Sequence, residues 1–424
     1  MENYLLKYLY ERADNPRVKK NLDYFKVNLD GRIYAYGDNM NPYYPEPQKQ
    51  SLYCVLKDIK TILNTKTAKH NRGGENNVLS LVRIPDSVPE KYGLNIIGSI
   101  LSPASKRCVK TPQLIKDYFA ISTITRRYDY NRFLSEELCN EIERIKRDLI
   151  EEYKKYNFKA IFVGNGEPFI NKLHIDVSKE LNIPSFIFLH GIPGIYNLDT
   201  EKRADYLLVW GEQIKLNYEN VGFDKERIFV TGSPKVQYKE NHSLRHSLED
   251  VLVTTSSSVE WSPFGWDYSN FPFNDRSLIV LYCYFVQDAL LQLGVKKARL
   301  RLHPSVGKNW INHFIDNSFY KIDDEPLQQS LGRSSLVIGP TSTVWLESLL
   351  EGVNYLVFEP GDNMYNFRHI AMVPPFDNSD NNLRVAKTGE ELMEMIKISY
   401  KPNLEIIHNY IEPFNFEKIC QIIK

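Results

Sequence analysis

Short apolar runs alternate with helical segments along most of this chain, and this alternation limits the possible folds more than any other feature. One series of predicted strands lies at 159–164, 184–189, 204–210 and 227–235. A second series lies at 250–254, 298–302, 335–338 and 355–358. Strands separated by helices form parallel sheets with right-handed crossovers. The sequence therefore predicts an α/β fold made of two doubly wound, Rossmann-like domains.

The length of 424 residues also indicates more than one domain. We predict a first domain over 1–240, a second over 241–400, and a C-terminal helical region over 401–424 that packs back on the first domain. The polar segment 236–249 is the predicted linker. A long amphipathic helix is predicted at 135–156 from its one-sided apolar stripe. In the least regular part of the chain, Asp30-Gly31 predicts the turn of a β-hairpin.

The charge balance and the cysteines restrict the class of protein. Lys plus Arg and Asp plus Glu both number 53, so no overall positive field is available for nucleic acid, and we expect no nucleic-acid partner. The five cysteines are dispersed, which favours reduced thiols. The N-terminus does not resemble a signal peptide, and no apolar run approaches the roughly 20 residues of a membrane span. These features predict a cytoplasmic protein.

The strand at 298–302 ends in Arg301, Leu302, His303 and Pro304. Ligands of open parallel sheets bind outside the carboxyl ends of the strands. An imidazole there can donate a hydrogen bond to a phosphate oxygen, and Arg301 can supply positive charge. His303 and Pro304 are therefore predicted to contact the phosphate of a nucleotide. The alternative is a surface histidine at a strand end.

Three hydroxyl residues, Thr341, Ser342 and Thr343, follow the strand at 335–338 and open a helix. Free N–H groups and hydroxyls at a helix N-terminus favour an anion. We predict a phosphate site at this cluster, with Glu347 on the same helix face as an acceptor for ribose hydroxyls. The alternatives are an ordinary N-cap and a solvated glutamate.

A further hydroxyl-rich loop contains Ser256 and Ser257 after the first strand of the second domain. It is predicted to bind the phosphate or a carboxylate of the sugar, and the alternative is a polar loop without a ligand. The sequence contains no DxD, HExxH or Cys/His cluster, so no metal is predicted.

Glu167 and His190 lie at strand ends of the first domain. Either side chain can act as a general base for an acceptor hydroxyl if its pKa suits that role. The sequence does not separate the two. The alternatives are a carboxylate in the first turn of a helix and a structural histidine in a turn. His174, in the middle of the next helix, is predicted to lie at the surface.

Four motifs together resemble the GT-B glycosyltransferases, and in particular the bacterial sialyl- and Kdo-type transferases of capsule and lipopolysaccharide that carry an HP motif. The residues that carry the resemblance are Phe188-Leu-His190-Gly191, Phe229-Val-Thr-Gly232-Ser233-Pro234-Lys235, His303-Pro304, and Gly339-Pro-Thr341-Ser342-Thr343 with Glu347. The acidic motif of several sialyltransferases has no clean counterpart, and Asn165-Gly166-Glu167 is the nearest sequence.

The resemblance implies transfer of a sialic acid, Kdo or related ulosonic acid from a CMP-activated donor to a hydroxyl of a bacterial surface glycan. No cofactor is expected beyond the nucleotide-sugar donor. Glu167 or His190 would deprotonate the acceptor, while His303 and the Thr341–Thr343 cluster would stabilise departing CMP. The expected partners are a glycan or glycolipid acceptor and other polysaccharide-assembly proteins, with peripheral association at the inner membrane.

Other functions fit the same residues. A CDP-glycerol or CDP-ribitol phosphotransferase has a similar His-Gly pair and a phosphate-binding histidine. A UDP-sugar transferase or epimerase shares the fold. A non-catalytic partner that binds a glycan or another transferase is the alternative from another class.

Overall fold

The structure is a computed structural model. It describes residues 4–34, 52–68, 76–84, 91–126, 130–164, 166, 168–193, 196, 198–240, 243–255, 277–304, 306, 308–361 and 372–423.

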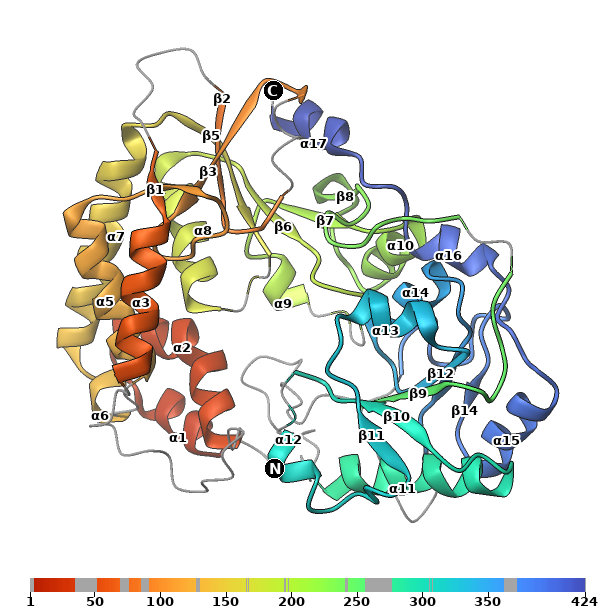
Figure 1. Ribbon diagram of the computed structural model, residues 1–424. Coiled ribbons are helices and arrows are strands. Elements are labelled where there is room, and N and C mark those ends of the chain that lie inside the picture. The colour runs from red at the N-terminus through yellow and green to blue at the C-terminus, as the bar shows by residue number, and fades with distance from the viewer. Residues whose placement is uncertain are drawn as a thin grey trace.

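The first sheet lies in the upper half of Figure 1, and all of its strand pairs are parallel. Its spatial order is β1 (Lys66–Thr67), β4 (Arg107–Val109), β3 (Leu94–Ser99), β2 (Asn76–Ser80), β5 (Phe158–Val163), β6 (Ser185–Phe188), β7 (Tyr206–Val209) and β8 (Ile228–Val230). The strand order places β2 next to β5, so the part of the chain before residue 110 extends the same sheet.

The second sheet, in the lower right of Figure 1, is also parallel throughout. Its order is β11 (Tyr320–Ile322), β10 (Ala298–Arg301), β9 (Val251–Thr254), β12 (Leu336–Gly339), β13 (Tyr355–Phe358) and β14 (Val385–Ala386). The central strands are buried on both faces, which explains their nearly continuous Val, Ile and Leu content. The predicted α/β fold with two Rossmann-like domains in a GT-B arrangement is confirmed.

Helices connect the strands of both sheets. Those before the second sheet are α1 (Tyr4–Arg12), α2 (Pro16–Tyr34), α3 (Leu52–Asn64), α5 (Pro112–Arg126), α6 (Tyr130–Phe133), α7 (Glu136–Lys154), α8 (Phe169–Leu181), α9 (Leu198–Glu201), α10 (Glu212–Asn220) and the 3-10 turn Lys225–Arg227. The later ones are α11 (Ser277–Gln292), α12 (Lys308–Ile311), α13 (Leu327–Arg333), α14 (Thr343–Leu350), α15 (Gly389–Lys397), α16 (Glu405–Tyr410) and α17 (Phe416–Ile423). In the described part of the chain, no helix combines the length and apolar character needed to cross a membrane.

The long helix predicted at 135–156 is α7. Ser135 caps its N-terminus and accepts a hydrogen bond from the backbone N–H of Leu138. Its buried residues are those of the predicted stripe, together with Cys139. The apolar spacing therefore identified the packed face of this helix correctly.

The hairpin expected around Asp30-Gly31 is wrong, because this segment belongs to helix α2. Val18, Leu22 and Phe25 of α2 are buried, and α2 packs against α7 and α8. Phe25 stacks on Phe169 of α8 with ring centroids 4.3 Å apart. Tertiary packing of this apolar stripe overrides the local turn preference of Asp-Gly.

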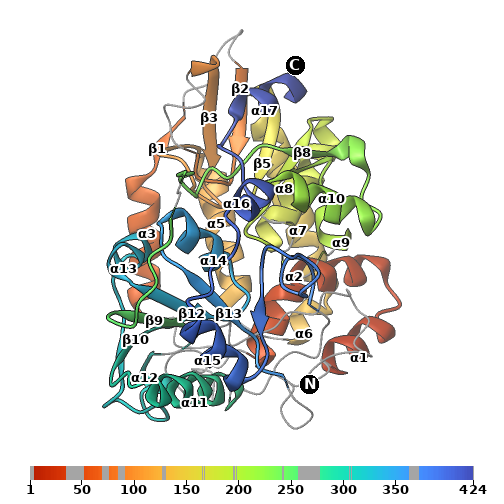
Figure 2. The same ribbon diagram turned by 90° about the vertical axis from the view of Figure 1, so that its right-hand side faces the viewer.

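The C-terminal segment runs back along the first domain. Figure 1 draws α17 in dark blue beside the first sheet, and Phe416 lies edge-to-face against Phe162 of β5 at 6.3 Å. The preceding helix α16 joins the two domains, since Tyr410 packs edge-to-face on Trp345 of α14 at 6.1 Å. Both of these side chains are fully buried. Figure 2 shows α16 between the two sheets.

Candidate functional site

Three adjacent strands of the second sheet deliver the predicted phosphate-binding residues to one edge. Thr254 at the end of β9 pairs in register with Arg301 of β10, and Val253 pairs with Ile338 of β12. The segment after β10 and the segment after β12 therefore lie on either side of β9. The backbone N–H of His303 donates to Thr255 Oγ1 at 3.0 Å, which fixes the start of the His-Pro segment against β9.

The segment before α14 is held by the same strand ends. Tyr355 Oη lies 3.2 Å from Thr254 Oγ1 and donates to the carbonyl of Pro340 at 2.6 Å. The backbone N–H of Thr341 donates to the carboxylate of Glu359. These bonds position the Thr-Ser-Thr cluster against the sheet.

The hydroxyls of this cluster have different roles. Ser342 is the N-cap of α14, and its Oγ accepts from the N–H of Val344 at 3.2 Å. Thr341 Oγ1 is buried and has no hydrogen-bond partner among the described residues. A buried hydroxyl without a partner costs free energy. The ordinary N-cap role accounts for Ser342 but not for Thr341.

The first domain meets α14 directly through the residues after β6. The backbone N–H of Ile192 donates to Thr343 Oγ1 at 3.2 Å. A Cβ atom on Gly191 would lie 2.3 Å from the same oxygen, so only glycine allows this approach. The residue before it, His190, is thereby placed at the junction of the two domains.

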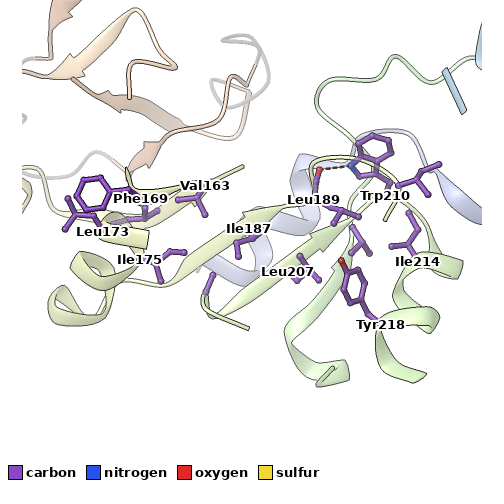
Figure 3. Packing of buried hydrophobic residues seen from close by; sticks show 14 of the residues in the cluster. Val163, Phe169, Leu173, Ile175, Ile187, Leu189, Leu207, Trp210, Ile214 and Tyr218 are labelled. Carbon is purple, nitrogen blue, oxygen red and sulfur yellow. Dashed lines mark hydrogen bonds between the residues drawn. The ribbon is translucent and has the colours of Figure 1, made fainter. Parts of the chain in front are cut away.

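The chain just before His190 is anchored in the core of the first domain. Trp210 Nε1 donates to the carbonyl of Leu189 at 3.1 Å, drawn as a dashed line in Figure 3. Leu189 and Trp210 are both buried. This rigid support fixes the backbone from which the His190 side chain leaves.

His190 and His303 lie close enough for their charges to interact. Both retain exposed surface. Surrounding protein nevertheless removes part of their hydration, which lowers the pKa of each imidazole. The positive charge of Lys235 lowers the pKa of His190 further, and the charge of His190 lowers that of His303. Both imidazoles are therefore neutral near pH 7 in the absence of an anion.

Lys235 is the residue that the motif contained but that we did not assign to the site. Gly232, three residues earlier, has φ +71°, and a Cβ atom added there would lie within 3 Å of the backbone of 412–414, so the C-terminal segment leaves room only for glycine in this turn. Lys235 is exposed and forms no ion pair within the described residues. Lys235 follows a strand of the first domain, as His190 does, and this position is the sequence signal that could have identified it.

Arg301 and Glu347 lie near each other, but Arg301 is already engaged. Its Nη1 donates to Asp323 Oδ1 at 3.2 Å and to the carbonyl of Glu325 at 2.7 Å. Burial raises the pKa of Glu347, and the guanidinium of Arg301 opposes that rise. The guanidinium of Arg301 is therefore occupied by Asp323 and Glu325, and its positive charge also acts on the half-buried carboxyl of Glu347.

Other predicted residues fall elsewhere. Glu167, Ser256 and Ser257 lie outside the described residues, whereas Pro304 is exposed beside His303. The surface position expected for His174 is wrong, because it is fully buried and its Nε2 lies 2.8 Å from Tyr153 Oη. Within the ranges that the structure describes, no group of three His, Cys, Asp or Glu side chains could hold a metal ion.

No protein-family model and no curated protein matches this chain. Its fold is similar to the UDP-GlcNAc 2-epimerase of Methanocaldococcus jannaschii in complex with UDP-GlcNAc and UDP, at 13% identity over 82% of this chain and 98% of that chain, with a TM-score of 0.47. It is also similar to UDP-N-acetylglucosamine 2-epimerase from Rickettsia bellii, at 11% identity over 82% and 96% of the two chains, with a TM-score of 0.48.

A third similar structure is UDP-GlcNAc 2-epimerase from Neisseria meningitidis bound to UDP-GlcNAc, at 12% identity over 82% and 98% of the chains, with a TM-score of 0.45. These proteins are epimerases and not the HP-motif transferases that the sequence resembles. At such identities and TM-scores, the similarities carry no argument about the reaction of this chain.

Proposed function

We propose that this protein is an enzyme of nucleotide sugars, and specifically a glycosyltransferase that binds the donor phosphate where His303 and the N-terminus of α14 meet the first domain. The observation that carries this proposal is the contact of Gly191 and Ile192 with Thr343 beside the interacting His190–His303 pair. The proposed site combines the imidazole of His303, the Thr341 hydroxyl, which has no partner among the described residues, and the N-terminus of α14. This combination suits a phosphate group.

In the proposed reaction, the bond between the anomeric carbon and the phosphate oxygen breaks, and negative charge grows on the leaving nucleotide. The imidazole N–H of His303, the Thr341 hydroxyl and the positive end of the α14 dipole would stabilise this charge. Lys235 would add positive charge from the first domain. This arrangement supplies charge stabilisation from side chains and the helix dipole.

The acceptor hydroxyl attacks the anomeric carbon and loses its proton as the new bond forms. His190 suits the role of base, since its lowered pKa leaves the imidazole neutral near pH 7. Glu167 remains the alternative base. We further propose that the first domain, 1–240, binds the acceptor and the second, 241–400, binds the donor. A glycolipid acceptor would suit a location at the cytoplasmic face of the inner membrane, with other polysaccharide-assembly proteins as partners.

We propose a CMP-linked ulosonic acid, such as a sialic acid or Kdo, as the donor, because the His-Pro and Thr-Ser-Thr motifs resemble those of CMP-sugar transferases. The first test is thermal unfolding of the protein with CMP, CDP, UDP and GDP in separate samples. A ligand that binds the folded protein raises the melting temperature. We expect CMP to raise it most. A larger shift with UDP would favour a UDP-sugar enzyme, and no shift with any nucleotide would refute the donor site.

The second test uses His303→Ala, with His313→Ala as the matched control. His313 is also an exposed histidine of the second domain. We expect the His303 variant to keep its melting temperature but to lose the nucleotide-induced shift and the transfer activity, measured by mass spectrometry of products from CMP-sialic acid or CMP-Kdo. The control should keep both. Full turnover by His303→Ala would remove this side chain from the mechanism.

A further inference from the structure

The surface formed by α3, β1, β4 and α5, which we call the α3–α5 face, exposes only positive charge. Residues 52–68 and 94–126 contain just two acidic residues, Asp58 and Asp117, and both are buried. The exposed cations are Lys57, Lys60, Lys66, Lys106, Arg107 and Lys116. This contrasts with the zero net charge of the whole chain. Exposed acidic side chains reappear on α7, where Glu137 and Glu151 bound the face.

Both carboxylates are turned inward and used there. Asp58 of α3 accepts hydrogen bonds from the hydroxyls of Tyr118 and Ser122 of α5, each at 3.0 Å. Asp117 of α5 pairs with Arg144 of α7 at 2.7 Å. These bonds join α3 to α5 and α5 to α7. The only negative charges of the face are therefore removed from its surface.

Apolar side chains lie exposed among these cations. Leu56, Ile59 and Leu63 of α3 are 55%, 40% and 75% exposed, and Phe119 of α5 is 36% exposed. The three residues of α3 are spaced three and four apart, so they form one stripe along the helix. Asp58 and Ile62 occupy the buried side of the same helix. Helix α3 therefore has a second apolar stripe that nothing in the described structure covers.

The cations at the end of α3 are held close to it. Lys110 Nζ donates to the carbonyls of Ile62 and Thr65, at 2.5 and 2.9 Å, and so caps the helix C-terminus. Lys66 follows the helix directly and pairs in register with Arg107 of β4. Figure 2 shows α3 on the left-hand side of the first domain, with α13 of the second domain drawn further to the left.

We propose that the α3–α5 face docks on a membrane surface that contains anionic lipid. Lysines beside a leucine-rich stripe are the pattern of interfacial helices, in which the apolar side chains enter the headgroup boundary and the cations meet lipid phosphates. Nucleic acid would satisfy the charges but not the aliphatic stripe. A symmetric dimer through this face would place its cations opposite their own copies, which is unfavourable.

This docking surface deepens the membrane location proposed above, but it does not depend on sugar transfer. Vesicle binding and sugar transfer are measured separately, so failure of one leaves the other in place. The full chain is mixed with vesicles of phosphatidylcholine, or of phosphatidylcholine with about one third phosphatidylglycerol. Flotation then gives the partition coefficient at low and at high salt. We expect binding to the anionic vesicles only, weakened by salt.

Two variants test the two components. Lys57→Gln/Lys60→Gln should lower the partition coefficient about 25-fold, since each lysine near an anionic surface contributes about fivefold. Leu56→Gln/Ile59→Gln/Leu63→Gln should lower it on the order of tenfold or more by removing the inserted stripe. The matched control is Leu216→Gln/Leu291→Gln, which alters leucines that are 47% and 48% exposed elsewhere. This control should bind like the unchanged protein.

Three outcomes would overturn the proposal. The first is equal binding to neutral and anionic vesicles, or none to either. The second is unchanged binding by both α3 variants while their melting temperatures match that of the unchanged protein. The third is a dimer in sedimentation analysis that the leucine variant converts to monomer, because the stripe would then be covered by a second copy.

Discussion

Substitution of Gly191 by alanine tests the contact that brings the two domains together. The added Cβ would lie 2.3 Å from Thr343 Oγ1, 3.5 Å from its Cβ and 3.9 Å from its Cγ2. The collision is therefore confined to the hydroxyl. That hydroxyl can rotate away only by giving up its bond from the Ile192 N–H, which is 3.2 Å long. Otherwise the two domains must move apart locally.

The expected cost follows from these two routes. Overpacking costs about 1–3 kcal/mol, and loss of a neutral hydrogen bond costs about 1 kcal/mol. Replacing glycine also lowers the conformational entropy of the unfolded chain, which stabilises the folded protein by roughly 0.5 kcal/mol. We therefore expect Gly191→Ala to lower the free energy of unfolding by about 1–2 kcal/mol. Thr343→Ala alone should cost about 1 kcal/mol, since it removes the bond but creates no collision.

The assay is a double-mutant cycle measured by urea unfolding. Gly191→Ala/Thr343→Ala removes the colliding oxygen, so its cost should fall short of the sum of the single costs by about 1 kcal/mol. Gly191→Ala/Thr343→Val is the matched control, because valine keeps a branched atom at the colliding position and should give no relief. Additive costs in both pairs, within about 0.3 kcal/mol, would refute the interdomain contact and the site built on it.

Three further predictions concern other parts of the protein. Burial lowers the pKa of His174 to about 4, so the neutral form stabilises the fold above pH 6.5 and this stability is lost as the pH falls toward 4. Between pH 6.5 and pH 4, the free energy of unfolding measured with urea should fall by about 3 kcal/mol more in the unchanged protein than in His174→Gln. Equal pH slopes in the two proteins would contradict the lowered pKa of His174. Asp323→Asn should cost about 3 kcal/mol of unfolding free energy because it leaves the buried cation of Arg299 without one of its partners, whereas Glu394→Gln, in an exposed ion pair, should cost under about 0.5 kcal/mol. A bound phosphate should raise the lowered pKa of His303, so nucleotide affinity measured by calorimetry should increase as the pH falls from about 8 to about 6. The pH dependence should be weaker in His303→Ala. An affinity that does not change with pH would show that the imidazole is remote from the phosphate.

The pattern of apolar residues was enough to predict most of the architecture. The eight strands expected after residue 158 correspond to β5 to β10, β12 and β13, with ends within about two residues, except that β8 ends at Val230 and not at the expected residue 235. The short strands β1, β4, β11 and β14 were not predicted, since two or three residues carry no periodicity. Helix α2 was missed for a different reason: the turn preference of Asp30-Gly31 is local, whereas the packing of α2 on α7 and α8 is not.

The candidate site shows the same division. Strand ends followed by His303 and by Thr341 to Thr343 could be read from the sequence, because the carboxyl ends of neighbouring parallel strands share one edge. The inward turn of Asp58 and Asp117, which leaves the α3–α5 face positive, could not be read in this way. It depends on hydroxyl and guanidinium partners on neighbouring helices.

The sequence by itself determined which segments are strands and helices, and which polar groups stand at the strand ends of each domain, because these properties follow from local spacing. Only the tertiary structure decided which ends face each other. The bond from Ile192 to Thr343 spans 151 positions of the chain, and no local pattern encodes a contact at that separation. Trp345 and Tyr410 also pack together between the domains, and His190 lies close enough to Lys235 and to His303 for their charges to interact.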